Sequence, residues 1–449
     1  MDRARLRRIL TMAGLAALFG PVQNAAETRH LTLTEAVHLA VSQNRELKIA
    51  RLRVIENEQK KAGERSTYFP TLTNQSNAMH LTDLPFVAIP AGAFGQAAGT
   101  PIPTQSGLLS QGNKTVFSSG TMIAQPLTQL LRIHDANRIA AADVAVSRDD
   151  LKKAENQVAL KVHALYFGIL IAGLQKQAAE QQTTYAGEHL RESEEDVRKG
   201  AALRVAAIDS RAGLLESQQA VLTADLQLSD LTTELNDLLG LPLDTRLELD
   251  AAVPANFDQR PQEEYVQTAW SENPEILAAE ETVRKARAGV GAAKTAYIPD
   301  VTAYARHSYQ DGVAFAVHNF GTFGVNLSWD VFDFGKRRAA VREHEAQLAQ
   351  AEENLRRLKE EVAVEIERGY NKVVRTRNMV QVADQVVKLR QESDRLAQNQ
   401  LAQGVILVSD RRHATAATYK ARADYLQANL EYLLAWAELE QTVGRTPGF

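Results

Sequence analysis

The sequence contains no cysteine among its 449 residues. Disulfide bonds, cysteine-based metal sites, thiol catalysis and a lipid-anchored N-terminal cysteine are therefore excluded. The chain also lacks an excess of one charge, because 51 Lys and Arg stand against 55 Asp and Glu, a formal net charge of −4. A nucleic-acid-binding protein would be expected to carry a concentrated basic surface, so we expect no nucleic-acid partner.

Sequence motifs of enzymes are missing as well. The chain contains no His-Glu-x-x-His, no Gly-x-Ser-x-Gly and no Gly-x-x-x-x-Gly-Lys. Its 10 histidines are scattered singly, so no metal-binding spacing arises. We expect no catalytic residues, no cofactor and no metal, and predict that the protein is not an enzyme.

Long apolar runs are absent after the N-terminal segment. A membrane-spanning helix needs about 18 apolar residues, so no transmembrane helix is predicted there. The N-terminal segment has four arginines within residues 3–8, a short apolar run at Ile9–Phe19, and small residues at Ala25 and Ala26. This order is typical of a cleaved signal peptide, which we assign to residues 1–26. The alternative is a membrane anchor, but the apolar run is too short to span a bilayer.

The chain carries an internal duplication. Residues 35–72 align without gaps on residues 264–301, and residues 120–240 align on residues 324–444. Identical pairs include Asn44 and Asn273, Tyr68 and Tyr297, Gly120 and Gly324, Gly200 and Gly404, and Gly240 and Gly444. The two offsets, 229 and 204, differ by 25, so the first copy carries 25 extra residues between its windows. We divide the mature chain into a first repeat, residues 27–245, and a second repeat, residues 246–449.

Both copies predict the same order of elements. A helical stretch ends at a Tyr-x-Pro sequence, because proline ends a helix and pushes its predecessor into extended geometry. An extended hairpin, a very long helix, a turn with glycine and a second helix follow. In the first copy the helical stretch is predicted at about 34–67, the hairpin at about 68–126 and the long helix at about 132–198, and the second helix runs up to 240. In the second copy the same elements are predicted at about 263–296, 297–332 and 336–402, and the second helix runs up to 444.

Apolar residues recur every seven positions in the long helices. One row contains Val144, Leu151, Val158 and Leu165, with counterparts at Leu348, Leu355 and Val362, and a second row contains Ile366, Val373, Val380 and Val387. Such spacing favours left-handed pairing of helices. A helix of about 66 residues is about 100 Å long, so it cannot fold around a compact core and must lie against other long helices. From the helices alone, the protein could be a secreted coiled-coil structural or interaction protein without a pore.

The segment 323–331 alternates between apolar and polar residues. Phe323, Val325, Leu327 and Trp329 point to one side, and Asn326 and Ser328 point to the other. An apolar outer face with a polar inner face is the pattern of an outer-membrane strand, so we expect the first set to face lipid. The alternative is a half-buried strand of a soluble sheet.

Four strands per chain cannot close a pore, and open sheet edges are not tolerated in lipid. Several chains would therefore share one barrel, and three would give about 12 strands. The partner segment 301–309 alternates less cleanly, because Tyr304 and Arg306 share a face. Residues 84–109 are rich in Gly, Ala and Pro, and we expect them to form an enlarged loop at the outer end or an insert without a role.

Taken in order, these features resemble the outer-membrane efflux proteins, the TolC-like family, over about residues 31–444. Residues 327–337 (Leu-Ser-Trp-Asp-Val-Phe-Asp-Phe-Gly-Lys-Arg) resemble the strand-to-helix junction of that family, with Asp333 and Gly335 as its Asp-x-Gly. The first copy keeps Pro126 and Leu127 at the equivalent place but lacks the Asp-x-Gly.

The resemblance implies a mostly α fold with β: a long α-helical barrel plus a transmembrane β-barrel shared between the protomers of a homotrimer. It implies a location in the cell outer membrane, in contact with outer-membrane lipid and extending into the periplasm. The implied function is the passive export conduit of a tripartite efflux or type I secretion system. A periplasmic adaptor (membrane fusion) protein and an inner-membrane pump would be its partners.

The two turns between long helices are candidates for docking the adaptor at the periplasmic tip. Their residues are Gly200, Leu203, Val205, Gly404 and Leu407. The alternative is that the apolar residues pack on neighbouring helices, while the glycines provide backbone freedom.

Asp410 follows Gly404 by six positions, where similar proteins place an acidic residue near the narrowest point of the pore. Three-fold symmetry would make a ring of three negative charges there, which attracts cations. The alternative is a helix N-cap, for which Ser409 and Asp410 are both suited. The first copy has Ala206 at this place, which argues against a second ring.

Overall fold

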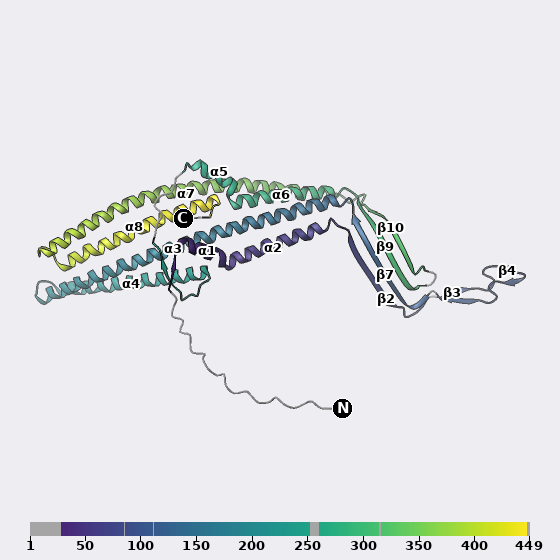
Figure 1. The fold of residues 1–449 in the computed structure, drawn as a ribbon, viewed down its shortest axis with the longest axis horizontal. Coiled ribbons are helices and arrows are strands. Elements are labelled where there is room, and N and C mark those ends of the chain that lie inside the picture. Colours follow the sequence, from purple (N-terminus) through teal and green to yellow (C-terminus); the bar gives the residue numbers. More distant parts are fainter. Residues whose placement is uncertain (1–27, 85, 111, 252–259, 314–315, 447–449) are drawn as a thin grey trace, which may run out of the picture. The chain divides into compact units, whose positions relative to one another are not determined.

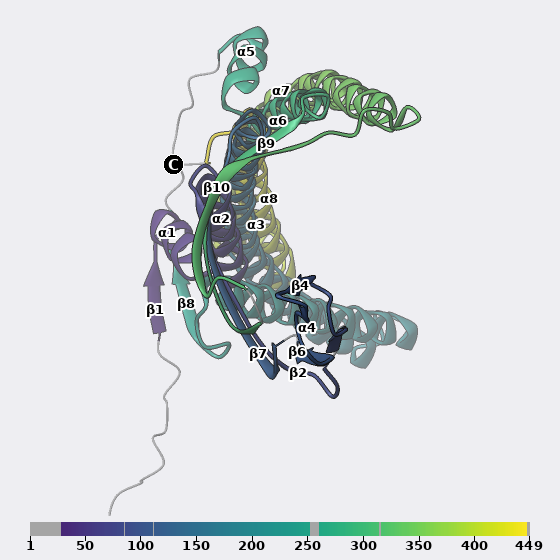
Figure 2. The same cartoon turned by 90° about the vertical axis from the view of Figure 1, so that its right-hand side faces the viewer.

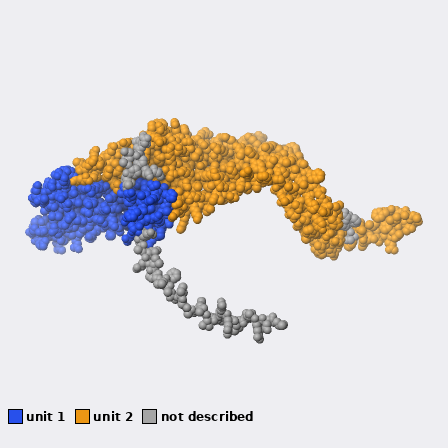
Figure 3. All heavy atoms as spheres, in the orientation of Figure 1, with its two compact units in different colours: residues 1–39, 165–253, 392–423 blue, residues 40–164, 254–391, 424–449 orange. Residues whose placement is uncertain are grey.

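The computed structural model describes residues 28–84, 86–110, 112–251, 260–313 and 316–446 (Figure 1). The predicted signal peptide, residues 1–26, lies outside the described residues. The chain divides into two compact units (Figure 3). Unit 1 contains residues 1–39, 165–253 and 392–423, and unit 2 contains residues 40–164, 254–391 and 424–449.

The helices before each pair of long strands are divided by an asparagine. Helices α1 (Leu33–Gln43) and α2 (Arg45–Ser66) meet at Asn44, and α5 (Gln262–Glu272) and α6 (Pro274–Thr295) meet at Asn273. In both copies the asparagine side chain accepts hydrogen bonds from the next helix, at 2.8 and 3.1 Å. An N-cap of this kind favours a new helix start, so each predicted helical stretch consists of two helices.

The main sheet lies in unit 2 and has four antiparallel strands in the order β10-β9-β7-β2. The strands, which lie side by side in Figure 2, are β2 (Thr71–His80), β7 (Gly112–Pro126), β9 (Asp300–Val313) and β10 (Asn319–Ser328). The hairpins of the two repeats therefore join through β7 and β9. The outer edges of β2 and β10 have no strand partner among the described residues.

The connection between β2 and β7 forms small hairpins of its own. Strand β3 (Phe86–Ile89) pairs with β6 (Gly107–Ser110), and β4 (Gln96–Ala97) pairs with β5 (Thr100–Pro101). This is the predicted enlarged loop. It has no charged residue from position 84 to position 113.

The long helices are α3 (Leu130–Arg198), α4 (Arg204–Leu239), α7 (Lys336–Ala402) and α8 (Val408–Val443). Their predicted apolar rows are largely buried: Val144, Val158, Leu165, Val362, Ile366 and Val373 all lie in the core. Within the described residues, α3 contains an 18-residue stretch apolar enough to cross a membrane, half of it buried inside the protein. The stretch is not the uninterrupted apolar run whose absence the sequence prediction used, and a buried core helix also has this composition.

Each unit has its own core. In unit 1, strand β1 (Thr28–Leu31) pairs in parallel with β8 (Arg246–Leu249), and the buried Tyr166 hydroxyl donates to the carbonyls of Leu31 and Asp250 at 3.0 and 2.9 Å. In unit 2, α5, α6, α7 and α8 bury one apolar cluster that includes Tyr265, Ile276, Ile366, Trp436 and Leu439. The long helices are thus held mainly by lateral packing.

Candidate functional site

The two turns that were predicted as docking sites have the same backbone. Five residues separate α3 from α4, and five separate α7 from α8; Gly200 and Gly404 have positive φ values of 74° and 70°. The Gly200 N–H donates to the Val197 carbonyl at 3.1 Å, and the Ala201 N–H donates to the Asp196 carbonyl at 2.9 Å.

The second turn repeats this pattern. The Gly404 N–H donates to the Leu401 carbonyl at 2.9 Å, and the Val405 N–H donates to the Gln400 carbonyl at 3.0 Å. This pair of bonds is the Schellman motif, in which a left-handed residue ends a helix. Glycine suits both positions because a side chain would be strained at that φ.

The apolar side chains of both turns are exposed. Leu203 is 77% exposed, Leu407 is 59% exposed, and Val205 is also open to solvent. Val405 of the second turn is exposed as well, and sequence reasoning missed one exposed neighbour of the first turn, Ile208. Packing within the same protomer therefore does not account for these residues, and they are available to another chain.

Asp410 lies in the first turn of α8, and its carboxylate is exposed. Its Oδ2 accepts a hydrogen bond from the Leu407 N–H at 3.1 Å. An acidic residue that reaches back to the N–H before the helix is half of a capping box. Asp410 is thus the third residue of α8 and stabilises the N-terminus of the helix through this bond. The N-cap position is that of Leu407, so neither Asp410 nor Ser409 is the N-cap residue.

The start of α8 is also tied to α3. Oε1 of Glu192 accepts a hydrogen bond from the Ser409 N–H at 2.9 Å. Oε2 of Glu192 and Nε of Arg411 are buried without a hydrogen-bond partner among the described residues. No sequence signal predicts this contact, because Glu192 is one of many charged residues on a polar helix.

The strand-to-helix junction is built around Asp333. Its Oδ1 accepts from the Gly335 N–H at 3.1 Å, and its Oδ2 accepts from the Arg337 N–H at 2.9 Å and from Arg337 Nε at 2.7 Å. The Arg337 guanidinium and the two N–H groups hold the pKa of Asp333 below its usual value. Gly335 has a φ of +90° and Phe334 a φ of +53°, so the chain turns sharply before α7 begins.

The Asp-x-Gly pattern therefore has a structural reason: the aspartate caps α7, and the glycine takes a left-handed conformation. Arg337 also lies over the ring of Tyr297, 5.6 Å from its centroid. Tyr297 belongs to the Tyr-x-Pro sequence before β9. The cation–π contact thus joins the two ends of the second hairpin at its helical side, and the ion pair with Asp333 holds Arg337 in place.

The predicted lipid-facing residues lie on β10, with one exception. Phe323 is 90% exposed, and Val325 and Leu327 are exposed on the same face. Strand β10 ends at Ser328, so Trp329 follows the strand, contrary to the predicted range 323–331. The reason is its partner: Ser328 pairs with Asp300, and Pro299 before it has no N–H with which to extend the ladder.

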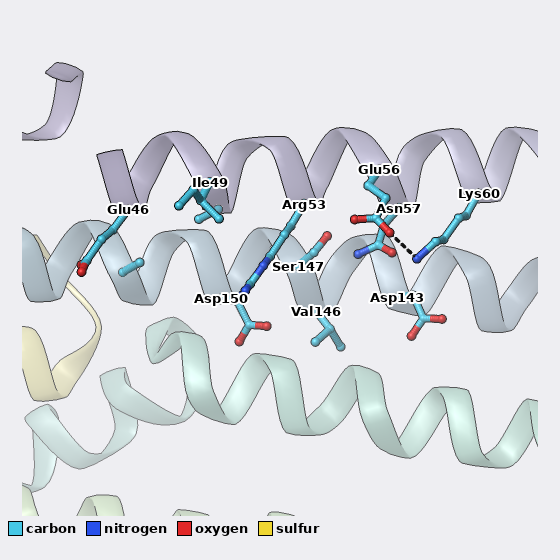
Figure 4. Close-up of a pocket in the computed structure, with 12 residues that line it drawn as sticks. Glu46, Ile49, Arg53, Glu56, Asn57, Lys60, Asp143, Val146, Ser147 and Asp150 are labelled. Carbon is cyan, nitrogen blue, oxygen red and sulfur yellow. Dashed lines mark ion pairs between the residues drawn. The ribbon is translucent and has the colours of Figure 1, made fainter. Parts of the chain in front are cut away.

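A groove between α2 and α3 in unit 2 has a volume of about 670 Å³ (Figure 4). Its ionisable side chains come from both helices: Glu46, Arg53, Glu56, Lys60, Asp143 and Asp150. Glu56 pairs with Lys60 at 2.7 Å, and Asp143 pairs with Lys285 at 2.7 Å. No group of three or more His, Cys, Asp or Glu among the described residues is placed to hold a metal ion. The groove is a charged surface formed by two neighbouring helices.

The chain is similar to known proteins of one kind. Residues 265–445 match the family model described as outer membrane efflux protein. Protein CyaE of Bordetella pertussis is 28% identical over 192 residues, which are 41% of this chain. That alignment spans 40% of the length of CyaE.

The fold is similar to solved outer-membrane channels over nearly the whole chain. The Campylobacter jejuni CmeC outer membrane channel matches with a TM-score of 0.74 at 17% identity, over 92% of this chain and 85% of that one. The Vibrio cholerae outer membrane protein VceC matches with a TM-score of 0.71 at 14% identity, over 93% of this chain and 97% of that one.

The mostly helical fold with strands and the outer-membrane location that the sequence predicted are both confirmed by these matches. The homologues are channel proteins and not enzymes. Residues 265–445 are thus similar in sequence to the outer membrane efflux proteins, and nearly the whole chain has the fold of the solved outer-membrane channels.

Proposed function

We propose that the protein is the passive outer-membrane conduit of a tripartite efflux or type I secretion system and that it has no enzymatic activity. The observation that carries this proposal is the four-stranded sheet, whose outer strands β2 and β10 have no further partner in the described part of the chain and which has one face rich in exposed apolar side chains. Such a sheet is not stable in lipid unless its edges are paired. Further copies of the same chain supply those edges, so that β10 of one copy pairs with β2 of the next.

The proposed assembly is a homotrimer in which each repeat, residues 27–245 and 246–449, supplies half of a protomer. Three copies give a closed barrel of about 12 strands, well above the smallest barrels of about 8. Phe323, Val325, Leu327 and Trp329 face the outer-membrane lipid, while Asn326 and Ser328 line the lumen.

Exposed apolar rows on the long helices support the same assembly. On α4 the row is Ile208, Leu215 and Leu222, and on α7 it is Val382, Leu389 and Leu396. Each row has the seven-residue spacing of a coiled-coil seam, yet Leu222 is 70% exposed and Leu389 is 72% exposed. In a trimer, α4 of one copy covers α7 of the next, which closes the helical barrel as well.

The partners we propose are a periplasmic adaptor protein and an inner-membrane pump. The adaptor binds the two turns through Leu203, Val205 and Leu407, around Gly200 and Gly404. Asp410 supplies a ring of three carboxylates at the periplasmic constriction. The Asp333–Gly335 junction fixes the angle at which the strands pass into the helices.

Mass measurement and conductance test the proposal together. Protein extracted from outer membranes in detergent is expected to have the mass of a trimer by light scattering and to form channels in planar bilayers. A stable folded monomer that forms no channel would contradict the proposal. That result would favour the second candidate, a secreted coiled-coil protein without a pore, which the exposed seams of α4 and α7 also fit.

Cysteine labelling tests the direction of the strand. The protein has no cysteine, so single cysteines at positions 325, 326 and 328 are unique labels. A membrane-impermeant thiol reagent that enters the pore should label positions 326 and 328 and spare position 325. The opposite pattern would place the apolar face of β10 in the lumen and refute the assignment.

A further inference from the structure

The polar face of the sheet carries one charged side chain near its middle, Arg306. The strand pairing places Arg306 of β9 opposite Met122 of β7 and Thr322 of β10. Since side chains alternate along a strand, Arg306 shares its face with Asn326 and Ser328. Under the proposed function this face lines the lumen, and the inference below depends on that assignment.

Arg306 lies flat on the sheet because the neighbouring strand has a glycine. Its Nη2 and Nε lie 2.7 and 2.9 Å from the position that a Cβ on Gly120 would occupy. No real side chain fits at that distance, so the guanidinium occupies the space that Gly120 leaves free. On the other side of β9, the Tyr304 hydroxyl lies 3.3 Å from the position of a Cβ on Gly324.

Gly120 and Gly324 are equivalent residues of the two repeats. Both repeats therefore place a glycine where a long side chain of β9 crosses the sheet. The two side chains line the wall without filling the space in front of it. Arg306 thereby presents its N–H groups along the wall and leaves the lumen open.

The charge of Arg306 is not neutralised by the sheet. No carboxylate in the described ranges lies within ion-pair distance of its guanidinium. On the same face, Asp300 at the helical end of β9 pairs with Arg132 at 3.6 Å, and Lys114 lies at the far end of β7. His307 and Asp311 alternate to the opposite face.

We propose that Arg306 forms an anion-binding site in the β-barrel lumen, with three guanidinium groups at one level of the trimer. The ligands are oxyanions, the carboxylate or phosphate groups of cargo in transit. A guanidinium binds both because its planar fork matches two oxygens at once. The site is weak and open, so it favours the entry of anionic cargo without retaining it.

Block of single-channel current by multivalent anions tests the site. Inorganic tripolyphosphate and citrate represent phosphate and carboxylate ligands, and both should block the wild-type channel at low salt, where screening is weak. Arg306→Gln should raise the blocking concentration about ten-fold and lower the chloride-to-potassium permeability ratio about two-fold. Arg306→Lys should keep the permeability ratio but lose part of the block, because an ammonium is a point charge. A difference between the two anions would identify the preferred group.

Two further variants separate position from charge. Lys114→Gln removes one cation from the same face near the far end of β7 and should change the block less than Arg306→Gln does. Gly120→Ala displaces the guanidinium from the wall into the lumen, so it should lower the conductance while keeping the block. An Arg306→Gln channel that is blocked as strongly as wild type would overturn the proposal.

Binding calorimetry distinguishes this failure from failure of the proposed function. Detergent-solubilised wild-type protein is titrated with tripolyphosphate, and Arg306→Gln should lose the binding heat. If the wild type conducts but binding does not depend on Arg306, the anion site is wrong and the channel stands. If the wild type forms neither a trimer nor a channel, the proposed function fails first, and the lumenal anion site falls with it.

Discussion

Helices α3 and α7 are equivalent parts of the two repeats, with 69 and 67 residues, but they differ in how they are buried. Val158, Val162 and Ile169 of α3 have buried counterparts in α7, at Val362, Ile366 and Val373. The remaining sides differ: Phe167 is buried, whereas its counterpart Asn371 is exposed. Helix α3 is surrounded by its own protomer along this stretch, while α7 is covered on one side only.

The difference shows how a duplicated chain can present two unlike surfaces. Two identical repeats would bury the same faces, but here this stretch of α3 is buried more fully, and α7 keeps an exposed row of apolar residues. The apolar stretch in α3 and the exposed seam of α7 are then two results of the same divergence. Several positions of one repeat therefore have a natural control at the equivalent position of the other repeat.

The largest effect is expected at the exposed seam of α7. Leu389→Glu places a carboxylate where we propose that α4 of the next copy packs, and burial of an unpaired charge costs several kcal/mol. The fraction of trimer measured by light scattering should fall at least about ten-fold. Gln391→Glu, an exposed position on the opposite side of the same helix, is the control and should assemble normally. A Leu389→Glu trimer as stable as wild type would show that this seam is not an interface.

Removing the helix cap at the strand-to-helix junction should lower the free energy of unfolding by about 1–2 kcal/mol. Asp333→Ala deletes the acceptor of the Gly335 and Arg337 N–H groups, and Gly335→Ala forces alanine to a φ of +90°. Faster hydrogen exchange over the first turns of α7 is the expected result. Gln129→Ala is the matched control, since Gln129 occupies the place of Asp333 in the first repeat. Equal protection of α7 in all variants would contradict a capping role for Asp333.

Asp149 of α3 should make stability depend on pH. Burial, with Glu281 and Asp150 nearby, raises the pKa of Asp149 to about 6. The folded state therefore binds the proton of the Asp149 carboxyl more tightly than the unfolded state does. The protonated carboxyl stabilises the fold at low pH, and this stabilisation is lost as the pH rises from about 4 to above 6. Asp149→Asn cannot ionise, so it should be more stable than wild type at pH 8 by about 1 kcal/mol, after allowance for its partial exposure.

The gain should vanish at low pH, where Asp149 is protonated in both states. Thermal unfolding of wild type and Asp149→Asn at about pH 3, below the ordinary pKa of Asp, and at about pH 8 measures this directly. The second repeat supplies the control, Glu353→Gln, because Glu353 is the counterpart of Asp149 and is an exposed partner of Arg356 at 2.7 Å. A gain for Asp149→Asn that is equal at both pH values would rule out a titration effect.

Much of the fold follows from local sequence signals. The predicted long helix at 132–198 begins at Leu130 and ends at Arg198, because its heptad rows, the preceding proline and Gly200 leave few alternatives. Contacts between distant residues were beyond sequence reasoning. The Glu192–Ser409 bond and the Arg306–Gly120 contact join residues that are separated by about 200 positions and carry no motif.

Strand ends were also difficult to predict for a physical reason. The alternation from Phe323 continues past Ser328 to Val331, so the apolar pattern alone extends the strand too far. The partner strand decides the end, and that partner stops at Pro299. The breaks at Asn44 and Asn273 could have been predicted, because an asparagine followed two residues later by a glutamate is a helix-start signal in both repeats.

The smallest effect on stability is expected at Asp410, where the two repeats differ by one charge. Asp410→Ala removes one hydrogen bond to the Leu407 N–H, which should cost about 1 kcal/mol or less in a helix held by lateral packing. The variant should therefore assemble, but with higher conductance and weaker block by multivalent cations if three carboxylates line the constriction. Asp410→Asn keeps a capping oxygen without the charge, so it separates the cap from the ring.

Ala206 sharpens the same test, because it is the counterpart of Asp410 in the first repeat. Ala206→Asp adds three carboxylates per trimer near the same turns, and cation block should become stronger if charge at this level controls passage. The double variant Asp410→Asn/Ala206→Asp should recover part of the cation block that Asp410→Asn loses. The electrostatic potential in the pore depends more on the number of charges than on the exact position of each carboxylate. If Asp410→Asn conducts and is blocked like wild type, and Ala206→Asp changes neither property, Asp410 acts only in the cap of α8. The narrowest point of the pore would then be controlled by other residues, and the difference between the repeats at this position would concern helix formation alone.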